Sequence, residues 1–207
     1  MIIVIDYDAG NTANVLRALA AIGAEARLSA DPKEILAADG LILPGVGAFR
    51  TAMQELQKRD LIGPIQEAVS GGKPFLGICL GMQLLLEVGL ENGQTSGLGF
   101  IPGVCRRIPD RAGLPVPHMG WNDLQIQQAS ALTNRLQGEA VYFVHSYYTD
   151  VDQEYLDATA DYGFPVPAMI HKGSVFGCQF HPEKSGQVGL EILRNFKEYI
   201  YEDSTSD

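Results

Sequence analysis

The sequence predicts an α/β fold, in which an open sheet of mostly parallel strands carries helices on both faces. Three observations support this prediction. Short apolar runs alternate with helical patterns through the first half of the chain. Glycine and proline are frequent between residues 89 and 117, and strand-like runs recur after that segment. Alternating strands and helices indicate a parallel sheet, whereas closely spaced strands indicate antiparallel additions in the second half.

Each element of the first half has a local signal. Ile2–Ile5 is an apolar run typical of a buried strand, and Asn11 or Thr12 can cap the helix that follows. Asp31 and Pro32 supply the N-cap and the first-turn proline of a short helix. The other expected strands are 26–28, 41–43 and Phe75–Cys79, and the other helical patterns are 53–56, 62–69 and 80–87.

The second half contains mainly strand signals and one long amphipathic helix. Loops and short antiparallel strands are expected at 89–117, strands at 140–144, 156–160, 166–170 and 174–180, and the helix at 188–201. We therefore expect one flavodoxin-like domain over residues 1–201. The polar segment 202–207 is expected to be a disordered tail.

Composition excludes several classes of protein. Of the 207 residues, 46% are hydrophobic and 19% charged, which is typical of a folded domain and excludes a disordered chain. The net charge of −10 argues against nucleic-acid binding, which depends on Lys and Arg. No apolar run is long enough to span a membrane and the N-terminus lacks a signal-peptide pattern, so a cytoplasmic protein is expected. The cysteines, Cys79, Cys105 and Cys178, are too scattered for a disulfide framework or a metal site.

A candidate nucleophile stands between an apolar strand and a helical pattern. Residues 77–81 read Gly-Ile-Cys-Leu-Gly, the thiol form of a nucleophile elbow. The flanking glycines suit a tight turn, and the helix that begins at Leu80 would direct its positive end at Cys79 and favour the thiolate. A buried structural cysteine is the alternative, because free cysteine is among the most buried residue types.

The candidate base is one of four histidines. His171 precedes a Lys-Gly turn and is expected to be a solvated hairpin residue, and His118 is expected in a loop. His181 is followed by Pro182, which favours an extended conformation there, so Glu183 can point in the same direction as His181. A carboxylate beside an imidazole fixes its tautomer and stabilises the imidazolium. The same alternation places Cys178 on the opposite face, whereas a surface His-Pro-Glu turn is the alternative reading of residues 181–183.

Three motifs together resemble the signature of the class I, or triad, glutamine amidotransferases. They are residues 44–47 (Pro-Gly-Val-Gly), 77–83 (Gly-Ile-Cys-Leu-Gly-Met-Gln) and 179–183 (Gln-Phe-His-Pro-Glu), in the order and spacing of that family. The resemblance implies hydrolysis of glutamine through a thioester at Cys79, with His181 as general acid and base and Glu183 as its orienting group. It implies oxyanion donors at Gly47 and Leu80, and glutamine-binding residues at Gln83, Glu91, His145, Ser146 and Tyr147.

Within that family, the glutaminase subunits of imidazole glycerol phosphate synthases are the most similar. The matches include residues 10–11, 44–49, 118–122, 142–147 and 181–185, whereas Asp8 departs from a loop in which a second glycine is expected. This resemblance implies a heterodimer with a cyclase subunit, a (β/α)8 barrel that uses the released ammonia in histidine biosynthesis. Candidate interface or ammonia-exit residues are Asn11, Trp121, Tyr142 and Lys184.

Other functions remain open on sequence alone. The same triad would serve a stand-alone cysteine hydrolase or peptidase, and anthranilate and pyridoxal-phosphate synthases also have glutaminase subunits. A binding module on the same scaffold is a further alternative, although such a module would normally have lost the cysteine or the histidine. The predicted chemistry needs no metal and no organic cofactor.

Overall fold

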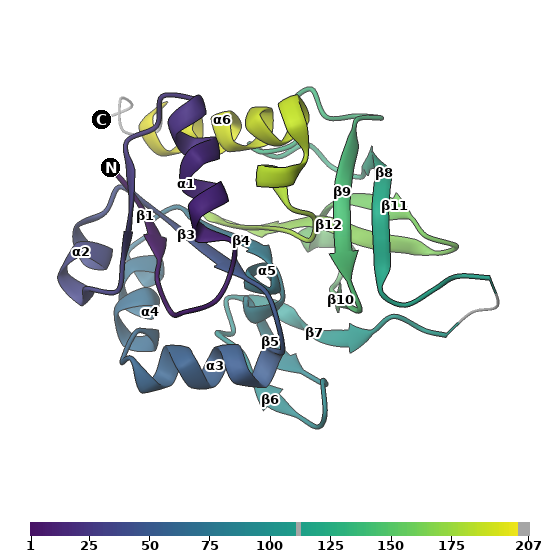
Figure 1. The fold of residues 1–207 in the computed structure, drawn as a ribbon, viewed down its shortest axis with the longest axis horizontal. Coiled ribbons are helices and arrows are strands. Elements are labelled where there is room, and N and C mark those ends of the chain that lie inside the picture. The colour runs from purple at the N-terminus through teal and green to yellow at the C-terminus, as the bar shows by residue number, and fades with distance from the viewer. Residues whose placement is uncertain (111–112, 203–207) are drawn as a thin grey trace.

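The central sheet of the protein has a parallel half and an antiparallel half. The computed structural model describes residues 1–110 and 113–202 (Figure 1). Five neighbouring strands run parallel in the flavodoxin-like order β2-β1-β3-β4-β13. They span Ala26–Ser29 (β2), Ile2–Ile5 (β1), Gly40–Gly45 (β3), Phe75–Cys79 (β4) and Val175–Cys178 (β13). The carboxyl ends of β3, β4 and β13 therefore meet at one edge of the sheet.

Four antiparallel strands extend the sheet beyond β13. Their order is β12 (Pro165–Lys172), β11 (Leu156–Asp161), β8 (His118–Ile126) and β9 (Ala140–His145). The expectation of antiparallel additions in the second half is confirmed. The expectation of a loop at His118 is wrong, because His118 begins β8 and is paired there with His145. The glycine and polar residues of β8 weaken its strand signal in the sequence, whereas pairing with β9 holds the strand in place.

A second sheet of four strands lies beside the parallel half. Its order is β10 (Tyr147–Asp150), β7 (Ile101–Arg107), β5 (Leu86–Gly89) and β6 (Thr95–Ser96). The helix expected over 80–87 is too long, because α5 covers only Leu80–Leu84 and β5 begins at Leu86. An apolar run as short as 84–86 is compatible with a helix or a strand. Leu86 is in a strand because it pairs with Ile101 of β7.

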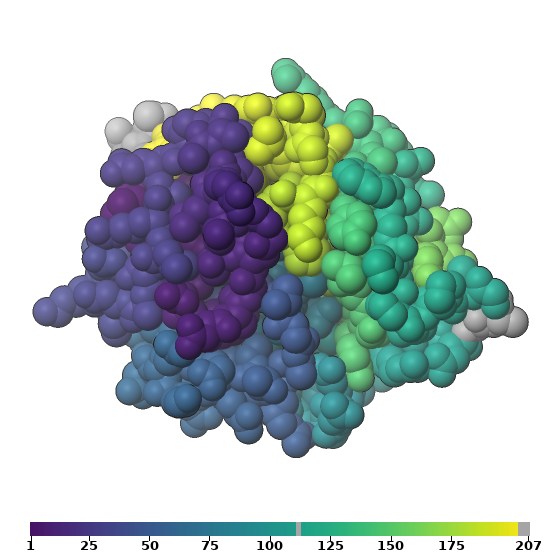
Figure 2. All heavy atoms as spheres, in the orientation of Figure 1, coloured from purple at the N-terminus to yellow at the C-terminus, as the bar shows by residue number. Residues whose placement is uncertain are grey.

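Helices cover both faces of the parallel sheet, as predicted. One face carries α1 (Thr12–Ala21) and α6 (Gly186–Glu202), which lie side by side in Figures 1 and 2. The other face packs against α2 (Pro32–Ala37), α3 (Phe49–Lys58), α4 (Ile62–Ser70) and α5. The expected cap of α2 is present, since the Asp31 side chain accepts a hydrogen bond of 2.8 Å from the Lys33 amide. Asn11 occupies the N-cap of α1 without a side-chain hydrogen bond.

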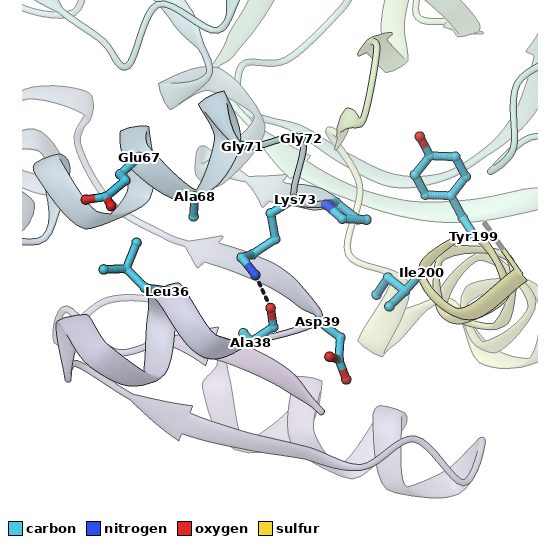
Figure 3. Close-up of a pocket in the computed structure, with 11 residues that line it drawn as sticks. Leu36, Ala38, Asp39, Glu67, Ala68, Gly71, Gly72, Lys73, Tyr199 and Ile200 are labelled. Atoms are coloured by element: carbon cyan, nitrogen blue, oxygen red, sulfur yellow. Dashed lines mark hydrogen bonds between the residues drawn. The ribbon is translucent and has the colours of Figure 1, made fainter. Parts of the chain in front are cut away.

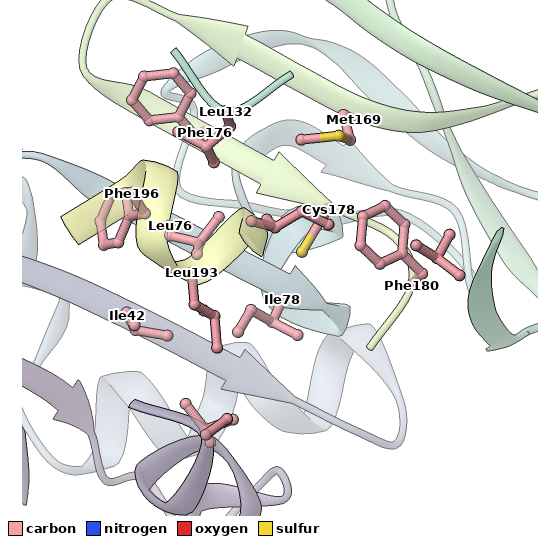
Figure 4. Packing of buried hydrophobic residues seen from close by; sticks show 14 of the residues in the cluster. Ile42, Leu76, Ile78, Leu132, Met169, Phe176, Cys178, Phe180, Leu193 and Phe196 are labelled. Atoms are coloured by element: carbon pink, nitrogen blue, oxygen red, sulfur yellow. The ribbon is translucent and has the colours of Figure 1, made fainter. Parts of the chain in front are cut away.

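The core between the sheet and α6 includes Cys178. Cys178 is fully buried and lies among Ile78, Met169 and Phe180 (Figure 4). Its side chain therefore points into the core, and it does not line the cavity beside Cys79 that is described below. All three cysteines are free thiols.

Two short 3-10 helices and the C-terminal helix complete the chain. The 3-10 helices are η1 (Gln153–Tyr155) and η2 (Pro182–Lys184). Of the segment predicted to be a tail, Glu202 ends α6, and 203–207 lie outside the described residues. Among residues 1–110 and 113–202, no helix has the length and apolar character needed to cross a membrane.

Candidate active site

The turn at Cys79 has a strained backbone that only close packing maintains. Cys79 adopts φ +56° and ψ −111°, a conformation that non-glycine residues rarely occupy. A Cβ atom at Gly77 would lie 2.5 Å from the Gly81 carbonyl oxygen, and one at Gly81 would lie 1.8 Å from the Leu43 carbonyl oxygen. Glycine is therefore required at both positions, because Gly77 lies against Gly81 within the turn and Gly81 lies against Leu43 of β3.

Besides His181, the Cys79 sulfur has two polar neighbours. Nε2 of Gln179 donates a hydrogen bond to Sγ at 3.8 Å, and Sγ lies 4.0 Å from the carbonyl oxygen of Val144. Neither neighbour belongs to the site residues predicted from sequence. Gln179 belongs to the 179–183 motif, but its spacing from Cys79 gives no indication of contact because 100 residues separate them.

His181 and Glu183 form a buried pair. Nδ1 of His181 lies 2.8 Å from Oε1 of Glu183, and the two side chains are only 2% and 1% exposed. The predicted extended conformation is wrong for Glu183, because residues 182–184 form η2. Pro182 at the start of this turn has the φ angle of a first helical residue, and the turn brings the carboxylate back to the imidazole.

The charge state of His181 follows from its neighbours. Burial lowers the pKa of His181, but hydrogen bonding and charge interactions with Cys79 and Glu183 outweigh this effect and raise the pKa to about 9. His181 is therefore an imidazolium at neutral pH. Its Nε2 atom is buried and, among the described residues, makes no hydrogen bond of ordinary length and angle, so in the pocket it faces the Cys79 sulfur and any ligand bound there.

A cavity of about 410 Å³ opens onto Cys79 and His181. It is also lined by every residue predicted to bind the oxyanion or the substrate: Gly47, Leu80, Gln83, Glu91, His145, Ser146 and Tyr147. This volume is within the range of small-molecule sites. Segments distant in the sequence therefore converge at the carboxyl edge of the parallel strands.

A larger cavity of about 840 Å³ lies at the opposite edge of the sheet. It is bordered by α2, α4 and α6 at the amino ends of β3 and β4 (Figure 3). Lys73 in this cavity donates its hydrogen bond to the Ala38 carbonyl oxygen. The cavity contains neither cysteine nor histidine in its lining, so the smaller cavity is the candidate active site.

Comparisons with known proteins agree with this geometry. The family model for class-I glutamine amidotransferases matches residues 3–199. The chain belongs to the class-I glutamine amidotransferases, and among them to the HisH subunits. A HisH subunit of imidazole glycerol phosphate synthase from Streptococcus sanguinis strain SK36 is 80% identical over 99% of both chains. That of Listeria monocytogenes strain EGD-e is 55% identical over 97% of both.

A solved structure of a glutamine amidotransferase shows the same fold. Its TM-score is 0.77 at 18% identity, with 97% of this chain and 99% of that chain covered. The predicted fold class is thus confirmed by both the strand topology and this amidotransferase structure.

The loop that carries Gly47 is supported by the loop after β1. The Tyr7 hydroxyl donates a hydrogen bond of 2.8 Å to the Pro44 carbonyl oxygen, and a Cβ atom at Gly10 would lie 3.0 Å from Pro44. Gly47 itself has φ +100°. Asp8, the departure from the amidotransferase pattern, has φ +61°, a conformation that glycine adopts without strain and aspartate tolerates. Aspartate therefore fits the backbone conformation at this position.

The predicted glutamine-binding side chains are already engaged with protein groups. Oε2 of Glu91 accepts a hydrogen bond of 2.8 Å from the Phe49 amide at the start of α3, so Glu91 is more than a solvated turn residue. Gln83 donates to the Tyr147 carbonyl oxygen at 3.0 Å and to Oε1 of Gln179 at 3.1 Å. These contacts fix both side chains at the wall of the pocket.

His145 is neutral and belongs to a chain of buried groups. Burial lowers its pKa to about 3. Its Nδ1 atom donates to the Tyr147 carbonyl oxygen at 2.8 Å, and its Nε2 lies 2.9 Å from Nδ1 of His118. His118 is stacked on Tyr162 at 3.9 Å. The sequence did not indicate this pairing of histidines.

Of the four predicted interface residues, only one lines the pocket. Lys184 lines the pocket, and Trp121 and Tyr142 face each other across β8 and β9 with ring centres 5.8 Å apart. Trp121 is 56% exposed. Asn11 is the N-cap of α1, which packs against η2. No contact in the structure assigns these residues a role.

His171 differs from its prediction. Its Nδ1 lies 2.5 Å from Oδ1 of the buried Asp157, and its ring stacks on Phe176. The residue lies in β12 and is paired, rather than solvated in a hairpin turn. It is outside the lining of the candidate active site.

Proposed function

We propose that this chain hydrolyses L-glutamine to glutamate and ammonia and passes the ammonia to a cyclase subunit in histidine biosynthesis. The observation that carries this proposal is the buried His181–Glu183 pair beside Cys79, at the wall of a pocket of about 410 Å³. The similar proteins are imidazole glycerol phosphate synthase HisH subunits, which supports the choice of pathway.

The proposed first step forms a thioester. The Cys79 thiolate attacks the side-chain amide carbon of glutamine, and a C–S bond forms as the amide oxygen becomes an oxyanion. Backbone N–H groups of Gly47 and Leu80 stabilise that charge. His181 transfers its proton to the amide nitrogen, the C–N bond breaks, and ammonia leaves. The imidazolium state of His181 at neutral pH supports its role as this acid.

The proposed second step regenerates the enzyme. Neutral His181 accepts a proton from water, whose oxygen attacks the thioester carbon. The C–S bond then breaks, glutamate is released, and the thiolate and imidazolium pair returns. Glu183 keeps the imidazole oriented in both steps through its contact with Nδ1. These steps require no metal or organic cofactor.

The proposed substrate contacts complete the site. The Glu91 carboxylate pairs with the α-ammonium group of glutamine, and Gln83 with the segment His145, Ser146 and Tyr147 binds the remaining polar groups. All of these residues line the same pocket as Cys79, which supports the assignment. A charged pair of this kind selects a free amino acid, which has an α-ammonium group, over an amide that lacks one.

The proposed partner is a (β/α)8-barrel cyclase subunit in a cytoplasmic heterodimer. It uses ammonia to form imidazole glycerol phosphate and the purine-pathway intermediate AICAR. Trp121, Tyr142, Lys184 and Asn11 are proposed to form the interface or the ammonia exit. The position of Lys184 at the pocket wall and the exposure of Trp121 support this assignment.

The test is glutamate release from L-glutamine by the purified chain, alone and with the cyclase subunit and its nucleotide ligand. We expect activity that depends on both, and its loss in Cys79→Ala. Cys105→Ala is the matched control, because Cys105 is buried in β7 outside the pocket. Equal activity without the partner would instead identify a stand-alone hydrolase. Activity that survives in Cys79→Ala would contradict the proposed nucleophile.

A further inference from the structure

Gln179 is a fully buried polar side chain beside the nucleophile. It follows β13, between the core residue Cys178 and the site residue His181, and is 0% exposed. Its amide nitrogen lies 3.8 Å from the Cys79 sulfur, and its amide oxygen lies 3.1 Å from Nε2 of Gln83. A buried amide must satisfy both its donors and its acceptor, so these contacts restrict its orientation.

The orientation of the Gln179 amide is determined by the Tyr147 carbonyl group, which acts through Gln83. The Tyr147 carbonyl oxygen can only accept, so the amide nitrogen of Gln83, at 3.0 Å, must face it. The same nitrogen also faces Gln179, which must therefore present its oxygen to Gln83. The NH₂ group of Gln179 is then left pointing at the Cys79 sulfur. The alternative, flipped amide would place two donors against each other at Gln83.

We propose that Gln179 is a positioning residue for Cys79: its amide N–H holds the sulfur and favours the thiolate, and Gln83 keeps that N–H pointed at the sulfur. The inference rests on the proposed function, in which Cys79 is the nucleophile. Gln83 then has a role in addition to any contact with substrate.

The Val144 carbonyl oxygen, the second neighbour of the sulfur, explains why the Gln179 N–H is needed to favour the thiolate. A thiol can donate its hydrogen to the Val144 carbonyl oxygen, which lies 4.0 Å from Sγ. A thiolate has no hydrogen to donate, so the carbonyl dipole favours the neutral thiol. The Gln179 N–H has the opposite preference, because a hydrogen bond to an ionised acceptor is stronger than one to a neutral acceptor. Since α5 has only five residues, its dipole offers limited help.

Other titratable groups surround the sulfur and must remain unchanged in a test. They are His181 with Glu183 behind it, Tyr7, the buried thiols of Cys105 and Cys178, and the titratable residues that line the same pocket, Glu91, His145, Tyr147 and Lys184. Replacement of Gln179 by leucine, which is uncharged, changes none of them directly. A shift in the ionisation of Cys79 would therefore report the loss of the amide donor.

The experiment measures the rate of alkylation of Cys79 by iodoacetamide between pH 5 and pH 10, with the Cys79 peptide quantified by mass spectrometry. In Gln179→Leu, we expect the apparent thiol pKa to rise by about one unit, which is a roughly tenfold slower reaction at neutral pH. Gln179→Glu should produce a larger rise, because a carboxylate repels the thiolate. Gln83→Leu should produce a smaller rise, because the Gln179 amide is then free to turn.

Thr149→Val is the matched control, since Thr149 is a buried polar residue of β10 whose hydroxyl makes no hydrogen bond with any described residue. It should leave the alkylation profile unchanged. A profile in Gln179→Leu that equals the wild-type profile would overturn the proposal. If Gln179→Leu does not fold, Gln83→Leu decides in the same way. The assay uses neither glutamine nor a partner, so its result is separate from success or failure of the glutaminase test.

Discussion

The backbone strain at Cys79 is confined to one residue, and it places the sulfur in the pocket. A φ of +56° costs on the order of 1–2 kcal/mol for a residue other than glycine. The strain lifts the sulfur from the end of β4 into the pocket, where His181 and Gln179 reach it. The surrounding contacts of Gly77 and Gly81 maintain the turn against this cost.

The protonation of His181 leads to a pH prediction. A raised pKa means that the imidazolium is present below pH 9 and is lost as the pH rises through about 9. Since the departing ammonia takes this proton, thioester formation in the complex should decline with an alkaline limb near pH 9. In Glu183→Gln, which removes one of the groups that raise the pKa, the limb should move toward neutral pH.

The pH profile of glutamate release by wild type and Glu183→Gln, each bound to the cyclase subunit, checks this prediction. Asp157→Asn is the control, because it alters a different histidine–carboxylate pair outside the pocket. An alkaline limb at the same pH in Glu183→Gln and wild type would disprove the contribution of Glu183.

At the scale of elements, two very short helices position several of the site residues. The five-residue helix α5 and the three-residue η2 position Cys79, Leu80 and His181. Each is held by packing against larger elements: α5 against β3 and β4, and η2 against β9 and α6. Helices this short are unstable in isolation, so the site depends on the packing of its elements.

The packing of α5 against β3 predicts a large effect for Gly81→Ala. The new Cβ atom would lie 1.8 Å from the Leu43 carbonyl oxygen, so β3 or α5 must move. We expect a loss of roughly 2–4 kcal/mol in the free energy of unfolding and a loss of glutaminase activity. Chemical denaturation measures the first effect.

Gly63→Ala is the matched control for this substitution. Gly63 lies in α4, and its Cβ would meet no atom within 4 Å. Because alanine favours a helix over glycine, this variant should be more stable by about 0.5–1 kcal/mol. Equal stability of the two variants would show that the α5–β3 contact is not as close as described.

At the scale of the whole molecule, the site and the larger cavity occupy opposite edges of one sheet. The antiparallel half adds the β8–β9 face beside the pocket, where exposed Trp121 packs against Tyr142. Exposed aromatic residues of this kind are frequent at the centre of protein interfaces. This arrangement favours docking of the cyclase on the β8–β9 side rather than on the α2 side (Figure 1).

Trp121→Ala tests this docking side. We expect the dissociation constant for the cyclase to rise by about tenfold or more, because a truncated tryptophan at an interface commonly costs over about 1.4 kcal/mol. Isothermal titration calorimetry with the cyclase measures this change, and the melting temperature should be nearly unaffected. Leu36→Ala on α2, which removes another exposed apolar side chain, should bind as wild type does. The reverse pattern would place the cyclase on the α2 side.

Local sequence patterns determined several strands, the helix α2 and the turn at Cys79. The apolar run Ile2–Ile5, the cap at Asp31 and the glycines around Cys79 act over a few residues, so the strands, α2 and the turn could be predicted from them. The short spacing of His181 and Glu183 also predicted their contact, although through an extended strand instead of η2.

Only the tertiary structure decided which distant residues share the pocket. Gln179 and Cys79 are 100 residues apart, and the histidine pair of His118 and His145 depends on the pairing of β8 with β9. The ends of α5 and β5 were set in the same way, by pairing of Leu86 with Ile101. Hydrogen bonds between strands and the burial of polar groups depend on neighbours in space, and the local periodicity of a sequence contains no record of those neighbours.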